Sequence, residues 1–70
     1  MSCVTFYDKD GCPLCDEARA ELEELGHPFE TARNPAYAER VPVIEVGGTV
    51  VTEGRISIRA VRRAIRAQGR

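Results

Sequence analysis

Gly11-Cys12-Pro13-Leu14-Cys15 is the stretch around which this sequence is organised. It follows a short apolar run and opens an amphipathic one. Proline is favoured at the first position of a helix, where its missing N–H is not needed. Pro13 therefore places Cys12 at the helix N-cap and Cys15 one turn inside the helix, which predicts that the two sulfurs lie within disulfide reach.

The start of a helix also favours a thiolate on Cys12. The first-turn N–H groups are free to donate hydrogen bonds there, and the positive end of the helix dipole lies at the same place. Lys9, three residues earlier, adds a positive charge, while Asp16 and Glu17 in the first turn oppose it. The sequence thus indicates a dithiol that can open and close, with Cys12 as its nucleophile.

A Cys-x-x-Cys pair is also half of a zinc site. Structural zinc usually needs a second Cys or His pair, and the remaining candidates, Cys3 and His27, are single residues without that spacing. Redox chemistry is the favoured interpretation, and no metal ligands are assigned. A metal-binding module with an external ligand and a protein with inert cysteines are the alternatives.

Length and composition set the protein class. Residues 1–70 are expected to form a single domain with a small core, because a chain this short buries only roughly 60% of its unfolded surface. Charged residues make up 30% of the chain and the net charge is −1, as in an ordinary globular protein. We expect a cytoplasmic location without membrane attachment, since there is no long apolar run or leader pattern and the three cysteines do not suggest a secreted disulfide framework.

The charge is divided along the chain. Residues 1–52 carry four basic and ten acidic side chains, net −6, whereas residues 53–70 carry six arginines and one glutamate, net +5. A basic segment can indicate nucleic-acid binding. We predict no nucleic-acid partner, because these arginines have a simpler role opposite an acidic helix, described below.

The first half of the chain is expected to form a strand, a loop and a helix. The strand covers 3–7, with Cys3 as one of its small buried residues. The polar loop that follows places Asp8, Lys9 and Asp10 in solvent. The helix shows apolar residues at a helical period and stops at a glycine followed by a proline; these residues are Leu14, Ala18, Leu22 and Leu25, then Gly26 and Pro28.

The second half predicts three further strands and two helices. Residues 28–32 form a short strand, and Asn34-Pro35 starts a short helix through 36–39. Strands at 43–46 and 49–52 are joined by a Gly47-Gly48 hairpin turn, and Ser57 caps the last helix. Its buried stripe is Ile58, Val61 and Ile65, with Ala64 and Gln68. A helical crossover favours parallel strands and a two-residue turn requires antiparallel ones, so we predict an α/β protein with a four-stranded mixed sheet.

Three segments resemble those of a known family: Gly11-Cys12-Pro13-Leu14-Cys15-Asp16-Glu17-Ala18, Arg40-Val41-Pro42-Val43 and Glu53-Gly54-Arg55. They are similar to the glutaredoxin branch of the thioredoxin fold, and in particular to the small bacterial glutaredoxin-like proteins of unassigned substrate. The resemblance covers nearly the whole chain. It implies a thioredoxin-like, glutaredoxin-type fold with flanking helices, in which the middle helix is shortened here.

The resemblance also implies a function, that of a small thiol–disulfide oxidoreductase. Cys12 attacks a substrate disulfide and Cys15 resolves the mixed disulfide. Pro42 is expected to be cis and to face the cysteines, with the backbone of Val41 pairing with a bound thiol peptide. The expected substrate-binding residues are Lys9, Pro13, Leu14, Arg40, Val41, Pro42, Gly54 and Arg55.

Departures from the family concern the positions that contact glutathione. Glutaredoxins usually have Tyr at Leu14, Thr-Val-Pro at 40–42 and Gly-Gly-x-Asp at 52–55. We therefore expect no tightly bound cofactor and only weak reduction by glutathione, with a flavin reductase as the other electron source. The substrate is expected to be a disulfide-containing protein or a small thiol. A thioredoxin-fold interaction module without redox turnover is the further alternative.

The resembled fold places the first and last helices on one face of the sheet. The acids of the first helix would then face the arginines of the last. The short middle segment leaves the other face covered only by Phe29, Ala36 and Tyr37. An uncovered face of this kind predicts weak homodimerisation or a partner-binding surface.

Overall fold

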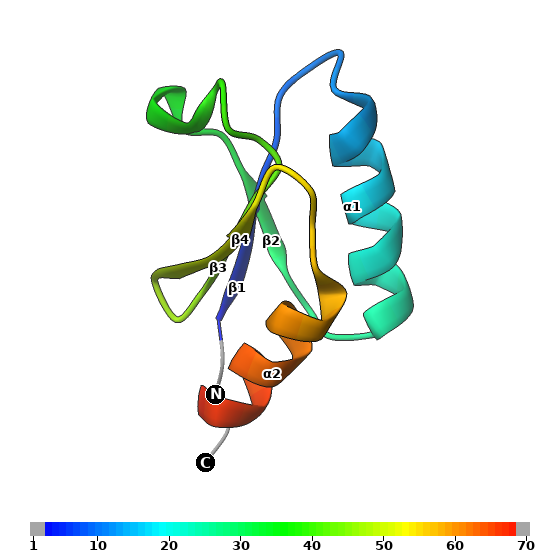
Figure 1. The fold of residues 1–70 in the computed structure, drawn as a ribbon, viewed down its shortest axis with the longest axis vertical. Coiled ribbons are helices and arrows are strands. Elements are labelled where there is room, and N and C mark those ends of the chain that lie inside the picture. The colour runs from blue at the N-terminus through cyan, green and yellow to red at the C-terminus, as the bar shows by residue number, and fades with distance from the viewer. Residues whose placement is uncertain (1–2, 69–70) are drawn as a thin grey trace.

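The computed structural model describes residues 3–68, which form an α/β fold. Its elements lie close to the bounds expected from the sequence (Figure 1). In chain order they are β1 (Val4–Tyr7), α1 (Pro13–Leu25), β2 (Glu30–Ala32), the 3-10 turn η1 (Pro35–Tyr37), β3 (Val43–Val46), β4 (Thr49–Glu53) and α2 (Ile58–Gln68). Neither helix of this part of the chain is long and apolar enough to cross a membrane.

The four strands form one mixed sheet, as predicted, and their order is β2-β1-β3-β4. Helix α1 connects β1 to β2, which run parallel, whereas β1 with β3 and β3 with β4 run antiparallel. The β3–β4 hairpin turns at Gly47 and Gly48, both of which have positive φ. A register shift between Ile44 and Glu45 interrupts the pairing of this hairpin.

Helix α1 starts and stops at the residues that the sequence indicates. Cys12 is the N-cap and Pro13 the first helical residue, while Gly26 ends the helix in the left-handed conformation. The buried face is formed by Cys15, Ala18 and Leu22. Leu14, expected on this apolar face, is 46% exposed, because each residue turns the helix by about 100° and the buried stripe is centred on Cys15.

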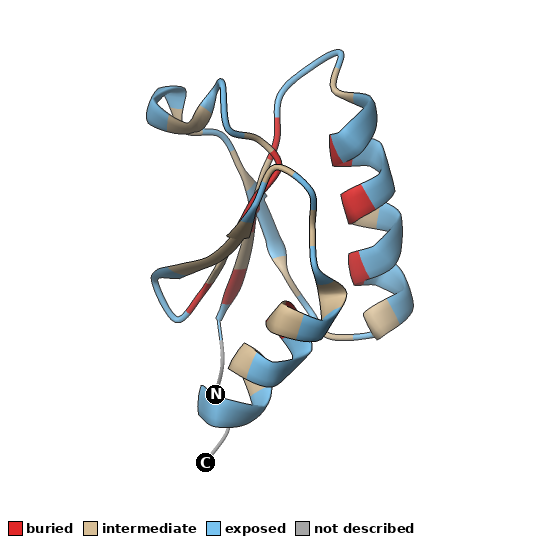
Figure 2. Ribbon diagram, in the orientation of Figure 1, coloured by how far each residue is buried: buried red, intermediate tan, exposed pale blue. Residues whose placement is uncertain are grey.

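The core lies between the sheet and both helices. Val4 and Phe6 of β1, Ile44 and Val46 of β3, the buried face of α1 and Val61 of α2 form one cluster. Figure 2 shows the buried residues of α1 on the side that faces the sheet. The two helices therefore share one face of the sheet, as predicted. Gln68 differs from the expected stripe: it is exposed, and its amide donates to the Val46 carbonyl at 3.0 Å.

Cys3 is exposed, so the prediction of a buried structural cysteine is wrong. Side chains alternate between the two faces of a strand. Val4 and Phe6 point into the core, which leaves Cys3 with Thr5 and Tyr7 on the opposite side. The Cys3 backbone still belongs to the fold, since its carbonyl accepts a hydrogen bond from Gly47 at 2.8 Å.

The second face of the sheet is covered differently from the prediction. The middle helix is a single 3-10 turn, capped by Asn34, whose side chain accepts from the Ala36 N–H at 3.0 Å. Phe29 does not cover this face: it packs edge-on against Phe6, with ring centroids 6.2 Å apart, and so belongs to the helix-covered core. Ala36 is exposed, which leaves Tyr37 as the residue of the three that covers the second face.

Tyr37 is held there by a shared carboxylate. Its ring lies edge-on to Tyr7 at 4.9 Å. Both hydroxyls donate to Glu45, at 3.2 Å from Tyr7 and 2.9 Å from Tyr37. Burial and the Glu45 charge raise the pKa of Tyr7, and the hydrogen bond to Glu45, followed by burial, raises the pKa of Tyr37. Two tyrosines and a glutamate thus replace part of a helix layer.

We predict that Glu45→Gln lowers the pKa of both tyrosines toward the ordinary value of 10.0, because the amide carries no negative charge. A tyrosine whose pKa is raised by folding contributes stability that is present below its ordinary pKa and is lost as pH rises through the raised value. The variant should therefore lose less stability than the wild type in this alkaline range. Tyrosinate absorbance and urea unfolding measure the two effects. Glu39→Gln is the control, and an unchanged tyrosine titration in Glu45→Gln would contradict the prediction.

Candidate functional site

Cys12 and Cys15 are brought together at the start of α1, as the sequence predicts. They form a disulfide with a Cα–Cα separation of 5.2 Å, inside the usual range of about 4.4–6.8 Å. The two cysteines differ in accessibility: Cys12 is half-buried, whereas Cys15 is 2% exposed and belongs to the core cluster. An incoming sulfur can therefore approach Cys12 more easily than Cys15.

The Cys12 sulfur occupies the N-cap of α1. Cys12 has extended backbone angles, with φ −113° and ψ 99°, and its Sγ accepts a hydrogen bond from the Cys15 N–H at 3.2 Å. A first-turn N–H aimed at the sulfur, together with the helix dipole, stabilises a negative charge on that atom. This geometry supports a thiolate on Cys12 once the disulfide is opened.

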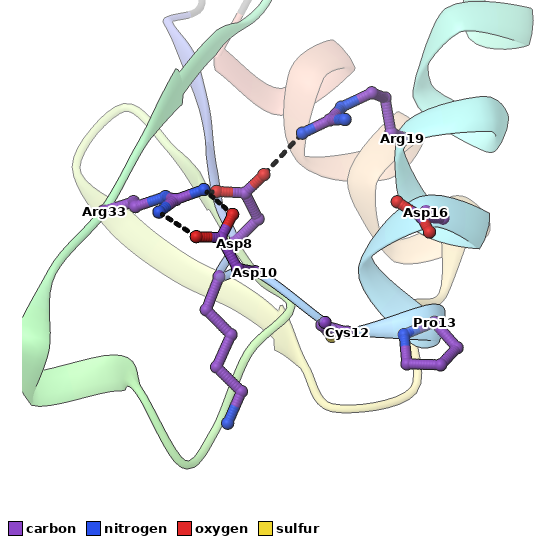
Figure 3. Close-up of a pocket in the computed structure, with 9 residues that line it drawn as sticks. Asp8, Asp10, Cys12, Pro13, Asp16, Arg19 and Arg33 are labelled. Atoms are coloured by element: carbon purple, nitrogen blue, oxygen red, sulfur yellow. Dashed lines mark hydrogen bonds and ion pairs between the residues drawn. The ribbon is translucent and has the colours of Figure 1, made fainter.

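A pocket of about 380 Å³ lies on one side of the pair. Figure 3 shows Cys12 and Pro13 at one side of this pocket and Asp8, Asp10 and Arg33 at another. Lys9 also lines it, so two of the predicted substrate-binding residues, Lys9 and Pro13, adjoin Cys12 here.

The burial of Asp8 in this pocket differs from the prediction, which placed Asp8 in solvent. Asp8 is only 8% exposed and forms ion pairs with Arg19 and, at 3.4 Å, with Arg33. The reason is that Asp8 continues the inward alternation of Val4 and Phe6 beyond the end of β1. That alternation was one available signal. The other was Arg19, the only basic residue of the otherwise acidic α1 sequence.

Arg33 joins the loop before Cys12 to the end of β2. Its Nη2 and Nη1 donate to the two Asp10 oxygens at 2.7 and 3.3 Å, while its Nε reaches Asp8. The Arg33 hydrogen bonds and charge lower the pKa of Asp10, and Asp10 in turn raises the pKa of Arg33. Arg33 is not among the residues predicted from the sequence, because its contact with Asp10 links residues 23 positions apart.

A second pocket, of about 400 Å³, lies along α1 next to the turn that follows β4. It brings together three predicted substrate-binding residues, Leu14, Gly54 and Arg55. The rest of its lining is formed by Glu17, Ala18, Glu21 and Ile56. The exposed Leu14 side chain is an apolar element of a pocket that also carries charges of both signs.

The remaining predicted residues meet at the entrance of β3. The Val41–Pro42 bond is cis, as expected, and Pro42 is buried while Val41 packs against the core. The Gly54 N–H donates to the carbonyl of Pro42 at 2.8 Å, which ties this entrance to the turn at the second pocket. The Arg40 charge is paired, because its Nε forms an ion pair with Glu53 at 3.2 Å.

The structure thus places the predicted residues in three neighbouring groups rather than in one cavity. Among residues 3–68, no three His, Cys, Asp or Glu side chains gather in a way that could hold a metal ion.

Comparison with protein-family models finds no match for this chain, and a search of curated proteins finds none either.

Asp8 is nearly buried and Asp10 is exposed, which leads to a prediction about their arginine partners. Arg19→Gln should destabilise the protein by about 1–3 kcal/mol, because it removes an ionic partner of a nearly buried carboxylate. Arg33→Gln should cost less, since its stronger pair is with the exposed Asp10. Urea unfolding of the two variants gives the comparison.

The Arg33 effect should also depend on pH. The pKa of Asp10 is lowered from its ordinary value of 3.8, so the stabilisation is complete above that pH and is lost as pH falls through the lowered value. Equal destabilisation by Arg19→Gln and Arg33→Gln at neutral pH would show that Arg19 is not the more important partner of Asp8.

Proposed function

We propose that this protein is a small thiol–disulfide oxidoreductase with a thioredoxin-like fold of the glutaredoxin type. The observation that carries the proposal is the Cys12 sulfur at the N-cap of α1, accepting the Cys15 N–H while lying at disulfide distance from a buried Cys15. Accessibility, charge stabilisation and a resolving partner are the three requirements of such a dithiol. The mixed sheet with both helices on one face is compatible with this fold.

The reaction begins with the reduced pair. The Cys12 thiolate attacks one sulfur of a substrate disulfide, whose S–S bond breaks, and the other substrate sulfur leaves as a thiolate that takes up a proton. Cys15 then gives up its proton and attacks the Cys12 sulfur of the mixed disulfide. The second substrate sulfur is released, two electrons have passed to the substrate, and the Cys12–Cys15 disulfide remains.

The substrate would lie along the second pocket and the entrance of β3. Leu14 supplies an apolar contact, and the Val41 backbone is the element that would pair with an extended peptide. The hydrogen bond from Gly54 to Pro42 keeps these two parts in a fixed relation. The mixed charges of the pocket, Glu17 and Glu21 against Arg55, favour a peptide or protein disulfide over a small anionic thiol.

The oxidised pair is then reduced by an external donor, either glutathione or a flavin-dependent reductase. We place the protein in a reducing compartment such as the cytoplasm, where such donors are present. Glutathione is the weaker donor here, because it carries two carboxylates that need positive partners. Arg40 is one of the few cations near the site, and Glu53 already neutralises it.

Cysteine variants test the proposal. Cys12→Ser should abolish disulfide reduction, and Cys15→Ser should accumulate a mixed disulfide with the substrate, identifiable after trapping from cell extract. Cys3→Ala is the matched control and should keep activity within a few-fold, since Cys3 lies on the other side of the sheet. Faster alkylation of Cys15 than of Cys12 in the reduced protein would reverse the assigned roles.

The Arg40–Glu53 pair gives a test of donor choice. Glu53→Gln should speed reduction of the oxidised protein by glutathione by about two- to fivefold, the size that one exposed charge pair supports. Reduction by a thioredoxin-reductase system should not change, and Glu39→Gln should affect neither donor. If glutathione already reduces the wild type rapidly and saturably, and the reductase does not, the proposed order of donors is wrong.

A further inference from the structure

The outer face of α2 carries an arginine stripe formed by Arg59, Arg62, Arg63 and Arg66. These residues recur at the i, i+3, i+4, i+7 spacing of one helix face, and all four are exposed and line one surface hollow of about 230 Å³. Like charges at these spacings repel one another. Within residues 3–68 none of the four forms an ion pair. The repulsion within the stripe is therefore not offset by any ion pair in the described part of the chain.

Helix α1 carries an acidic stripe of the same period, formed by Glu17, Glu21 and Glu24. All three side chains are exposed, and none of them is in an ion pair in the described part of the chain. The first and last residues of each stripe are seven positions apart, which corresponds to about 10 Å of helix. The carboxylates and the guanidinium groups thus carry opposite charges and recur at a similar spacing.

The two stripes lie on opposite sides of one groove. This groove has a volume of about 210 Å³ and is lined by Glu21 and Glu24 from α1 and by Arg62 from α2. Leu25 and Ile58 supply its apolar part. No ion pair joins the two stripes across the groove within residues 3–68. One surface of the protein is therefore acidic on its α1 half and basic on its α2 half.

We propose that this surface is a docking site for a second copy of the chain. In a two-fold arrangement the acidic stripe of each copy meets the arginine stripe of the other, because an isologous interface pairs a surface with itself. The surface is complementary to that of a second copy only when the two copies are related by such a two-fold axis. A long polyanion such as nucleic acid fits less well, since the α1 carboxylates border the arginines and the chain has a net charge of −1.

The expected association is weak and sensitive to salt. A stable interface takes about 800 Å² from each partner, about a sixth of the 4713 Å² that residues of this chain expose. Electrostatic attraction is expected to carry most of the interaction, because the groove between the stripes offers only two larger apolar side chains, Leu25 and Ile58. This proposal does not rest on the redox function, because no step of the disulfide chemistry requires a dimer; the dimer surface does share Glu17 and Glu21 with the pocket proposed for the substrate.

Sedimentation of the wild-type protein tests the association. We expect concentration-dependent dimers at about 10 mM salt, where the Debye length is about 30 Å, and loss of at least about nine-tenths of the dimer affinity at about 1 M, where it is about 3 Å. Dimers that persist or strengthen at high salt would point to apolar association, as expected for the thinly covered sheet face, and would overturn the proposal. A monomer under both conditions would overturn it as well.

Stripe reversal gives the sharper test. One variant carries Glu17→Lys, Glu21→Lys and Glu24→Lys, and a second carries Arg59→Glu, Arg62→Glu and Arg66→Glu. Each should lose the low-salt dimer. A third variant that combines all six changes has the wild-type net charge and a restored pairing, so its dimer should return.

Circular dichroism confirms that each variant is folded, and the disulfide chemistry is measured in parallel. A dimer in either single-stripe variant, or a folded six-residue variant that stays monomeric, would refute the pairing. Binding of single-stranded DNA by a wild-type protein that does not dimerise would assign the arginine stripe to a polyanion instead.

Discussion

The alternation of side chains along β1 is the constraint on which most of this structure depends. Val4 and Phe6 point to the face of the sheet on which α1 and α2 pack, and Asp8 continues the same alternation beyond the strand. Thr5 and Tyr7 point to the other face, where Tyr7 shares the Glu45 carboxylate with Tyr37. Because β1 lies in the interior of the sheet, an inversion of its two faces would displace the core and the loop before Cys12 together.

The candidate site depends on that strand through the loop that leads to Cys12. Asp8 forms ion pairs with Arg19 of α1 and with Arg33, which follows β2, and Arg33 also forms an ion pair with Asp10. This small ionic network fixes the loop on both sides, while the cap and the buried Cys15 fix the first turn of α1. The Cys12 sulfur is consequently held at the helix N-terminus by elements that are distant in sequence, which is how a rigid framework keeps a reactive group oriented.

The charges of the protein divide into those that are paired and those that are not. Near the dithiol, Arg19, Arg33 and Arg40 each have a carboxylate partner, whereas Lys9 and Arg55 form no ion pair within residues 3–68. On the outer faces of α1 and α2 the stripes have no partner within residues 3–68. The two regions overlap at Glu17 and Glu21, which also line the second pocket, whereas Glu24 and the arginine stripe do not line it.

The sequence by itself determined the elements and the cysteine pair, because these follow from local rules. The proline after Cys12, the glycine at 26, the cap at Asn34 and the two-glycine turn each fix backbone geometry within a few residues. Tertiary structure alone decided which side chains meet across long separations. Asp8 pairs with Arg33, Phe29 packs in the helix-covered core and Cys3 is exposed. These outcomes depend on the register and the faces of the assembled sheet, whose energies come from contacts between segments far apart in the chain.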